Sequence, residues 1–336
     1  MRGNTWVWGW ILLAAASCQT AQPIGVDARD AGASVLSTSL VFRQVFPSGA
    51  GTDLRAMTVG PADDIWIAGR FFTSLQIGET TLTSAGPSDV FVARLDRMGN
   101  PRWTARVGGC AGLAVDADGN AIVAYQGLAA RAGVTGEIIW KNRGLPLAES
   151  WPIELAVDRE GNAIIGEGRT VSPDIGLQKV SASGVIQFKK RFRGHGDGGN
   201  FSGVSADPQG NIVISGAGGV ELGGWTRPEN GGAPWIGKLD PSGNRIWQVF
   251  GVEGRVAADD AGNVLYANAD SVGKLDPQGG WIWKHAARID GEVGAVATDS
   301  TGRVIYAGSF QGRVDFGDGL VDSGEHAALF VAAIAP

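Results

Sequence analysis

The sequence predicts an all-β fold made of six copies of a four-stranded unit, and three observations lead to this prediction. Glycine accounts for 53 of the 336 residues, about twice its usual share. A short hairpin phrase recurs six times along the chain, and a second, aromatic hairpin phrase follows several of its copies. Many short alternating apolar runs in a glycine-rich chain are typical of strands joined by tight turns.

The first phrase is an apolar alternation, then Asp, two residues, Gly and Asn, then another apolar alternation. It is clearest in residues 113–123 and 155–165. Further copies have turns at residues 207–211, 259–263 and 299–303, and a degenerate copy at 59–65 stands first. Asp at the start of a turn accepts hydrogen bonds from the backbone that follows, and Gly supplies a positive φ. The phrase therefore predicts a β-hairpin with alternate residues facing the core.

The second phrase is an apolar strand, often ending Lys-Leu-Asp, then two residues, Gly and an aromatic strand. It occurs at residues 93–103, 237–247 and 273–283, and weaker copies end at Trp140 and Phe188. Two hairpins make a four-stranded sheet, which is one blade of a β-propeller. The spacing between copies runs from about 40 residues (Asn263 to Arg303) to about 56 (Asp64 to Asn120), which suits blades with loops of unequal length. The prediction is a six-bladed β-propeller.

The two ends of the repeat region complement each other. The last copy runs through residues 331–334 without an aromatic fourth strand, whereas residues 41–46 are similar to 246–250. We therefore expect residues 39–46 to complete the sixth blade, which would hide two sheet edges. The recurring aromatic residues are expected to pack between blades rather than to bind a ligand. They are Phe42, Trp103, Trp140, Phe188, Trp247 and Trp283.

The N-terminal segment has the features of a targeting signal. Residues 1–17 contain one basic residue, Arg2, and an apolar run at 6–16 that is too short to span a bilayer of about 30 Å. The sequence Ala-Ala-Ser-Cys ending at Cys18 resembles the lipobox of bacterial lipoproteins, which implies a lipid on Cys18 and a location outside the cytoplasm. Gln19 after the cysteine favours the outer membrane by analogy. Ordinary signal cleavage that leaves Cys18 as a thiol is the alternative.

The domain organisation follows from these segments. We expect a lipoprotein signal peptide at 1–17, a flexible tether at 18–38 and the propeller at 39–336. The chain has two cysteines, so a lipid on Cys18 would leave Cys110 without a disulfide partner. A net charge of −6 argues against a nucleic-acid partner, because phosphate binding needs clustered Lys and Arg.

The repeats resemble the bacterial β-propeller repeats called SBBP repeats and, more loosely, NHL repeats. The stretches that carry the resemblance are residues 69–96 and 308–334, and the second contains the element Ser-Phe-Gln-Gly-Arg-Val-Asp-Phe-Gly at 309–317. The resemblance covers about residues 39–336 and implies the fold. It implies little about activity, because propellers host many functions. The second, third and fifth copies lack the long insertion between the second and third strands.

The residues with catalytic potential are few and scattered. The three histidines, His195, His285 and His326, lie in different copies, and no zinc-type spacing or nucleophile elbow is present. Residues 116–120 resemble the opening of a calcium loop but lack the later ligands. We therefore predict no cofactor, no resident metal and no catalytic set.

The informative polar positions lie about seven residues before each turn, where the inner strands begin. The candidates are Asp53, Trp151, Asn200, Glu253 and Glu292. In a propeller they would surround one mouth of the central channel and could bind a cation or sugar hydroxyls. The alternative is that they are solvated turn residues.

The function that fits best is a monomeric, membrane-anchored scaffold that binds an envelope protein or a glycan. Two alternatives remain. A propeller enzyme of the lyase or lactonase type would use the acidic ring with His195 and His285. A carbohydrate-binding module would use Trp151 and Trp225.

Overall fold

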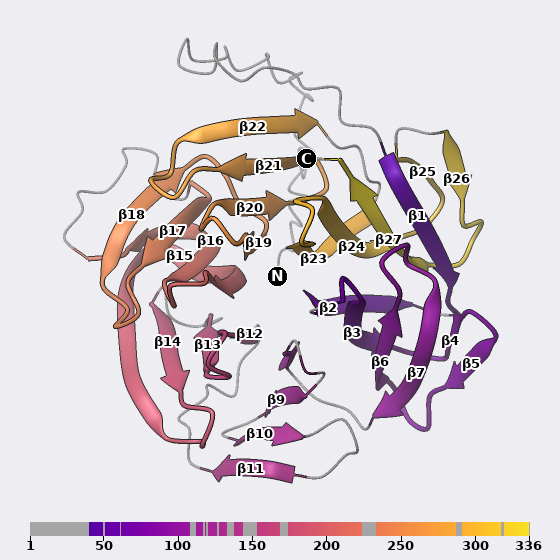
Figure 1. The fold of residues 1–336 in the computed structure, drawn as a ribbon, viewed down its shortest axis with the longest axis horizontal. Coiled ribbons are helices and arrows are strands. Elements are labelled where there is room, and N and C mark those ends of the chain that lie inside the picture. The colour runs from indigo at the N-terminus through magenta and orange to yellow at the C-terminus, as the bar shows by residue number, and fades with distance from the viewer. Residues whose placement is uncertain are drawn as a thin grey trace, which may run out of the picture. The chain divides into compact units, whose positions relative to one another are not determined.

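Every regular element in the described part of the chain is a β-strand (Figure 1). The computed structural model describes residues 40–49, 51–60, 62–107, 112–116, 118, 120–125, 128–132, 138–143, 153–168, 174–223, 233–286, 291–316 and 319–335. The chain divides into two units, Met1–Ala33 and Ser34–Pro336. The predicted signal peptide and tether, Cys18 and Cys110 lie outside the described residues. Among the described residues there is no helix with the length and apolar character that crossing a membrane requires.

Three sheets have four antiparallel strands in simple chain order. The first contains β2 (Thr52–Val59), β3 (Ile65–Phe71), β6 (Asp89–Leu95) and β7 (Pro101–Val107). The second contains β8 (Gly112–Val115), β9 (Ala121–Tyr125), β10 (Leu128–Ala132) and β11 (Ile138–Arg143). The third contains β19 (Arg255–Ala258), β20 (Val264–Ala267), β21 (Ser271–Leu275) and β22 (Trp281–Ala286).

A larger sheet is held together by one long strand. It contains β12 (Ile153–Val157), β13 (Ala163–Glu167), β14 (Ile175–Val180), β15 (Ile186–Ala206), β16 (Ile212–Glu221), β17 (Trp235–Leu239) and β18 (Arg245–Phe250). The first third of β15 pairs with β14 and the remainder pairs with β16, where the register is irregular between His195 and Asn200. Dividing β15 gives two further groups of four strands. The count of six blades depends on this division and remains a prediction.

The last sheet joins the two ends of the described chain. Its order is β1 (Leu40–Pro47), β27 (Ala328–Ile334), β24 (Val304–Phe310) and β23 (Gly291–Thr298). Phe42 lies opposite Ala333 and Phe46 opposite Leu329, and both phenylalanines are buried. The prediction that the leading segment completes the final sheet is therefore confirmed, with a strand one residue later than the expected 39–46.

The inner strands form a closed ring. β2, β8, β12, β15, β19 and β23 each contact the next, and β23 contacts β2 (Figure 1). Two extra hairpins follow the second strand of the first and last sheets. They are β4 (Ser74–Ile77) with β5 (Thr80–Thr83), and β25 (Arg313–Asp315) with β26 (Leu320–Asp322). They correspond to the insertions that distinguish these copies in the sequence.

The recurring Asp organises each inner hairpin turn. Oδ1 of Asp207 accepts hydrogen bonds from the backbone N of Gln209 (3.0 Å) and Asn211 (2.8 Å), and Gly210 adopts a φ of 78°. Lys238 of β17 then places its Nζ 2.8 Å from Oδ2 of Asp207, with both side chains buried. The same ion pair joins Lys179 to Asp158 and Lys274 to Asp259. The Lys of the second phrase thus neutralises the buried Asp of the first, which explains why the two phrases recur together.

The aromatic residues of the outer strands pack against the neighbouring sheet. A Cβ placed on Gly99 would lie 2.8 Å from the ring of Phe42, and one on Gly243 would lie 3.2 Å from Phe188. Trp247 lies against Gly279 in the same way, with a distance of 3.1 Å. The predicted packing role is therefore confirmed for these three rings, and Trp283 is also buried. Trp103 differs, because it is 45% exposed and contacts Trp66 instead.

Candidate functional site

A cavity of about 540 Å³ lies between the inner strands. Residues of β2, β8, β12, β15, β19 and β23 line it. Alanines occupy much of the wall, among them Ala56, Ala156 and Ala257, so the centre of the ring is not filled by side chains. The volume lies within the range of about 300–1,000 Å³ that is usual for ligand sites.

The turn-side end of this cavity, where the first and second strands of each sheet connect, carries exposed polar pairs. Arg159 of the β12–β13 turn forms an ion pair with Asp260 of the β19–β20 turn. Asp63 accepts hydrogen bonds from Ser300, whose turn joins β23 to β24. Arg159 and Asp260 are 65% and 81% exposed, so their attraction is weakened by solvent.

The opposite end, where the inner strands begin, carries a denser network, which we call the strand-start mouth. It consists of Asp53, Arg55, Arg70, Glu154, Arg255 and Glu292. Nη1 of Arg255 on β19 lies 2.6 Å from Oε2 of Glu154 on β12, and both side chains are nearly buried. Nη2 of Arg255 lies 3.7 Å from Oε1 of Glu292 on β23, a side chain that is 63% exposed. Arg255 is thus held firmly on one side and loosely on the other.

A glycine lets β15 and β19 approach each other closely beside Arg255. Strand β15 runs between β12 and β19 in the ring and presents Gly203 at this level. A Cβ on Gly203 would lie 3.0 Å from the backbone N of Val256 and 3.2 Å from the Cα of Arg255. The missing side chain therefore allows the close approach of β19, the strand that carries Arg255.

The remaining carboxylate of the mouth, Asp53, forms ion pairs with two arginines. Its Oδ2 forms an ion pair with Arg55 and lies 3.5 Å from Nη2 of Arg70. Its Oδ1 is buried and makes no hydrogen bond within the described part of the chain. Arg55 occupies an irregularity of β2 between Leu54 and Ala56, and such a bulge turns a side chain away from the normal alternation. Arg55 therefore lines the cavity.

Burial controls the protonation of the Arg255–Glu154 pair. Burial raises the pKa of the Glu154 carboxyl above its usual range, while the charges of Arg255 and Arg55 act in the opposite direction. For Arg255, burial acts to lower the pKa, but the carboxylates of Glu154, Glu292 and Asp53 together outweigh it and the pKa is raised. The guanidinium is therefore charged, and Glu154 holds a proton more readily than an exposed glutamate.

The predicted site residues are only partly brought together. Asp53 and Glu292 both lie at the strand-start mouth, and the charges of both carboxylates raise the pKa of Arg255. Glu253 lies in the loop before β19, where its backbone O accepts a hydrogen bond of 2.8 Å from Asn268. Asn200 belongs to the irregular part of β15, and its side chain is outside the described set. Trp151 and Trp225 lie outside the described residues.

Glu154 and Arg255 were missed by the sequence reasoning, although a signal for them exists. Each stands four residues before the Asp of its turn, Asp158 or Asp259, inside a run that is otherwise apolar. Positions four and two before the turn lie on one face of a strand, so a charge at the first of them faces the channel. A position seven residues before the turn lies at or beyond the strand end and is a poorer guide.

The described histidines lie away from the mouth. His285 is on β22, the strand of its sheet farthest from the inner strand β19, and contacts Trp283 with ring centroids 5.0 Å apart. Burial lowers the pKa of His285. His326 is exposed, and the side chain of His195 is outside the described set. The hypothesis that His285 acts together with the carboxylates of the mouth is therefore wrong. Among the described side chains, no three His, Cys, Asp or Glu residues gather as a metal site.

Comparison with known proteins identifies the fold class. No protein-family model and no curated protein matches the chain. Virginiamycin B lyase from Staphylococcus aureus is similar in structure, with a TM-score of 0.50 and 12% identity over 86% of this chain and 98% of that one. BBS1N, crystallised in complex with ARL6DN, has a TM-score of 0.51 and 9% identity over 89% of this chain and 97% of that one. The fold is a β-propeller.

At these identities the likeness concerns the fold of the propeller alone. The neighbours include an enzyme and a protein crystallised with a partner, which agrees with the range of functions that propellers carry. The function of this propeller has to be argued from its own residues.

Proposed function

We propose that this propeller is a lipid-anchored scaffold outside the cytoplasm that binds an envelope protein at the strand-start mouth. The lipobox-like segment ending at Cys18 and the similarity to SBBP repeats support the location. The binding role rests on the two unequal contacts of Arg255. Its guanidinium forms a close ion pair with buried Glu154 on one side, and on the other side it faces exposed Glu292 at a longer distance.

The loose side of Arg255 is suited to an acidic group of a partner. At 3.7 Å, Glu292 is beyond hydrogen-bond distance, and its exposed side chain can turn into solvent. A carboxylate of the partner that replaced it could form a bidentate, charge-assisted pair with the guanidinium. Glu154 fixes the guanidinium beforehand, so little side-chain entropy remains to be lost on binding.

The first test is recovery of a partner from envelope extracts with the full chain, followed by affinity measurements with the purified partner. Glu292→Gln removes the competing carboxylate, so we expect affinity to rise about twofold to fivefold, the effect of one exposed ion pair. Arg255→Lys keeps the charge but loses the planar fork and should weaken binding. Glu325→Gln, an exposed substitution in the β26–β27 loop, is the matched control and should change nothing.

Two outcomes contradict the scaffold. One is a wild-type pull-down with no protein above background. The other is a partner whose affinity is the same for Glu292→Gln and the wild type, because that partner would bind elsewhere.

A lyase or lactonase is the second candidate, and one observation favours it. Glu154 combines a raised pKa with a position in the wall of the cavity beside Arg255. A carboxyl with a raised pKa can act as general acid or base, and a fixed guanidinium can stabilise a developing oxyanion. A panel of lactones and cyclic esters tests this candidate. Turnover by the wild type that is lost in folded Glu154→Gln supports it, and no turnover across the panel removes it.

A further inference from the structure

A second charged cavity lies on the turn side of the first sheet. Its volume is about 520 Å³. Ala62, Asp64, Arg94, Asp96, Arg97, Met98 and Arg102 line it. Three guanidinium groups and two carboxylates give this lining a net charge of +1, whereas the whole chain carries −6. The lining therefore has the opposite sign to the net charge of the chain.

Two of the three arginines have their charge balanced inside the cavity wall. Nε of Arg94 lies 2.6 Å from Oδ2 of Asp64, and Nη2 of Arg102 lies 3.0 Å from Oδ2 of Asp96. Asp96 also accepts hydrogen bonds from the backbone N of Met98 (2.8 Å) and Asn100 (2.9 Å). Burial opposes ionisation of Asp96, but the hydrogen bonds from Asn100 contribute to a pKa below the usual range. Both carboxylates therefore already have arginine partners in the wall of the cavity.

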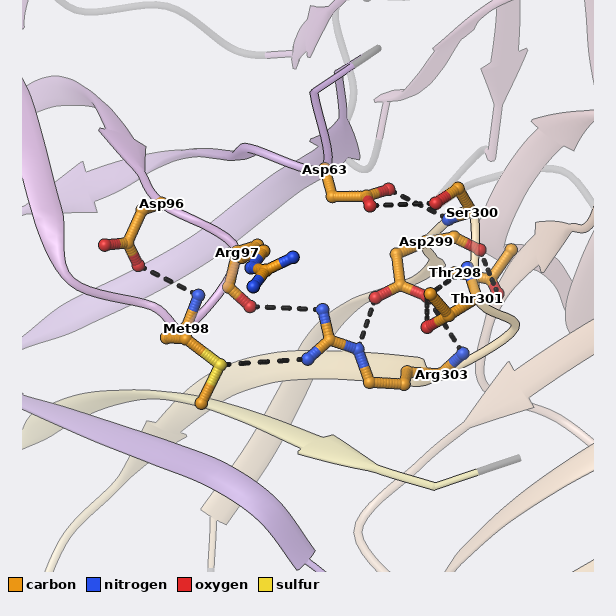
Figure 2. A network of polar contacts seen from close by, with 9 residues as sticks. All are labelled: Asp63, Asp96, Arg97, Met98, Thr298, Asp299, Ser300, Thr301 and Arg303. Carbon is orange, nitrogen blue, oxygen red and sulfur yellow. Dashed lines mark hydrogen bonds and ion pairs between the residues drawn. The ribbon is translucent and has the colours of Figure 1, made fainter.

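Arg97 is the exception. Its side chain is exposed and makes no hydrogen bond or ion pair with any residue that the structure describes; no dashed line reaches its guanidinium in Figure 2. All the donors of this guanidinium are available to a ligand, in a cavity whose carboxylates already have partners.

The last repeat holds the turn that carries Arg97. Nη2 of Arg303 donates to the backbone O of Arg97 over 3.2 Å, and Nη1 lies 3.9 Å from the sulfur of Met98 (Figure 2). Arg303 is itself fixed by an ion pair with Asp299. On the other side, Nε2 of Gln44 in β1 donates to Oδ1 of Asn100 over 3.2 Å. The cavity is therefore preorganised from both neighbouring segments, which lowers the entropy lost on binding.

We propose that this cavity binds a phosphate group, with Arg97 as the principal donor and Arg102 as its neighbour. The planar fork of arginine matches two phosphate oxygens, which makes it the preferred residue for bidentate recognition of such anions. The position of the cavity suggests where the phosphate group comes from. Leu40, the first described residue of β1, lies opposite Ile334, and Ile334 pairs with Val304 next to the turn of Arg303.

Leu40 therefore lies on the turn side of the propeller. If Cys18 carries a lipid, which rests on the proposed function, one source is the phosphate of a lipid headgroup; a free phosphate compound is the other.

The test uses the full chain and inorganic phosphate, titrated at low ionic strength and followed by calorimetry. We expect saturable binding by the wild type and an affinity lowered about tenfold in Arg97→Ala, the effect of losing one charge-assisted contact. Arg97 is exposed and unpaired within the described part, so this variant should fold normally. Arg191→Ala, which removes an exposed arginine from β15 far along the chain, is the matched control and should bind as the wild type does.

Vesicles distinguish the two sources. If Arg97→Ala also binds phosphatidylglycerol vesicles more weakly than the wild type, the ligand is a lipid headgroup. If only inorganic phosphate binding falls, the ligand is a free phosphate compound. No saturable phosphate binding by the wild type, or equal binding by Arg97→Ala, overturns the proposal. Neither result depends on recovery of a protein partner or on Glu292, so the proposed function can fail separately.

Discussion

Asp63 and Ser300 join the first and last repeats at the point where the ring closes. Oδ1 of Asp63 accepts a hydrogen bond from the backbone N of Ser300 (2.9 Å), and Oδ2 accepts one from its Oγ (2.8 Å), across 237 residues of sequence (Figure 2). Among the described residues, Asp63 is the only one other than glycine with a positive φ, at 58°. A strained residue thus makes one of the contacts that close the ring.

The irregular sequence of the first repeat follows from this contact. Asp63 stands where the other turns have Gly, and Asp64 stands where they have Asn. Gly60 takes the place of the turn Asp, so Asp64 supplies the carboxylate, which accepts hydrogen bonds from Arg94 (2.6 Å) and Trp66 (2.9 Å). In the last repeat Arg303 replaces the Asn. The two repeats that depart from the common phrase are the two that meet each other.

The Asp63–Ser300 contact predicts an order of stability among variants. Asp63→Ala loses both hydrogen bonds and keeps the backbone strain, so we expect the free energy of unfolding to fall by about 1–3 kcal/mol. Asp63→Gly also loses the bonds but relieves the strain and should lose less. Urea denaturation of the two variants measures the difference. Asp63→Gly being less stable than Asp63→Ala would contradict the role given to the strain.

The buried Lys238–Asp207 pair predicts a large loss on truncation. Lys238→Met leaves Asp207 buried without its cation and removes the hydrogen bond of 3.0 Å from Nζ to the backbone O of Gly262. We expect the free energy of unfolding to fall by about 3–5 kcal/mol. Arg313→Met, which breaks the exposed pair with Asp322, is the control and should unfold like the wild type. A similar stability for the two variants would show that the buried pair does not hold the two hairpins together.

The hairpins could be predicted because their signals are local, and the ring closure could be predicted because one strand sequence is repeated elsewhere in the chain. The φ of Gly210 and the hydrogen bonds of Asp207 depend on five consecutive residues, and the match of 41–46 to 246–250 is visible by comparison. The strand-start mouth was only half predicted. Asp53 and Glu292 were found, but the contact between Arg255 and Glu154 was not, because it joins β19 to β12 across the intervening strand β15. Such a contact is set by strand register and tertiary packing, which the repeat phrase does not encode.

Glu154 predicts a specific pH dependence of stability. Its folded pKa is raised above the unfolded value, so the folded state binds the proton more tightly. The stabilisation from that proton is complete below the ordinary carboxyl pKa and is lost as the pH rises through the folded pKa. Glu154→Gln resembles the protonated form, so it should gain stability relative to the wild type as the pH rises.

Thermal unfolding of both proteins between about pH 4 and pH 8 measures this difference. Asp259 and Asp299 have lowered pKa values and destabilise both proteins on acidification, so their effect cancels in the comparison. A stability difference that does not change with pH would mean that the pKa of Glu154 is the same in the folded and unfolded states.

The joint between β1 and β27 predicts where the ring opens first. Phe42→Ala removes a buried ring from the contact with Gly99, and we expect it to lower the free energy of unfolding by about 3–5 kcal/mol. Because β1 covers the edge of β27, backbone amides of β27 should exchange with deuterium faster in this variant, whereas those of β20 should keep their wild-type rates. Val41→Ala, at a neighbouring position that is 37% exposed, is the control and should leave both strands unchanged. Equal acceleration in β27 and β20 would mean that the sheets unfold together and that the joint is no weaker than the rest of the ring.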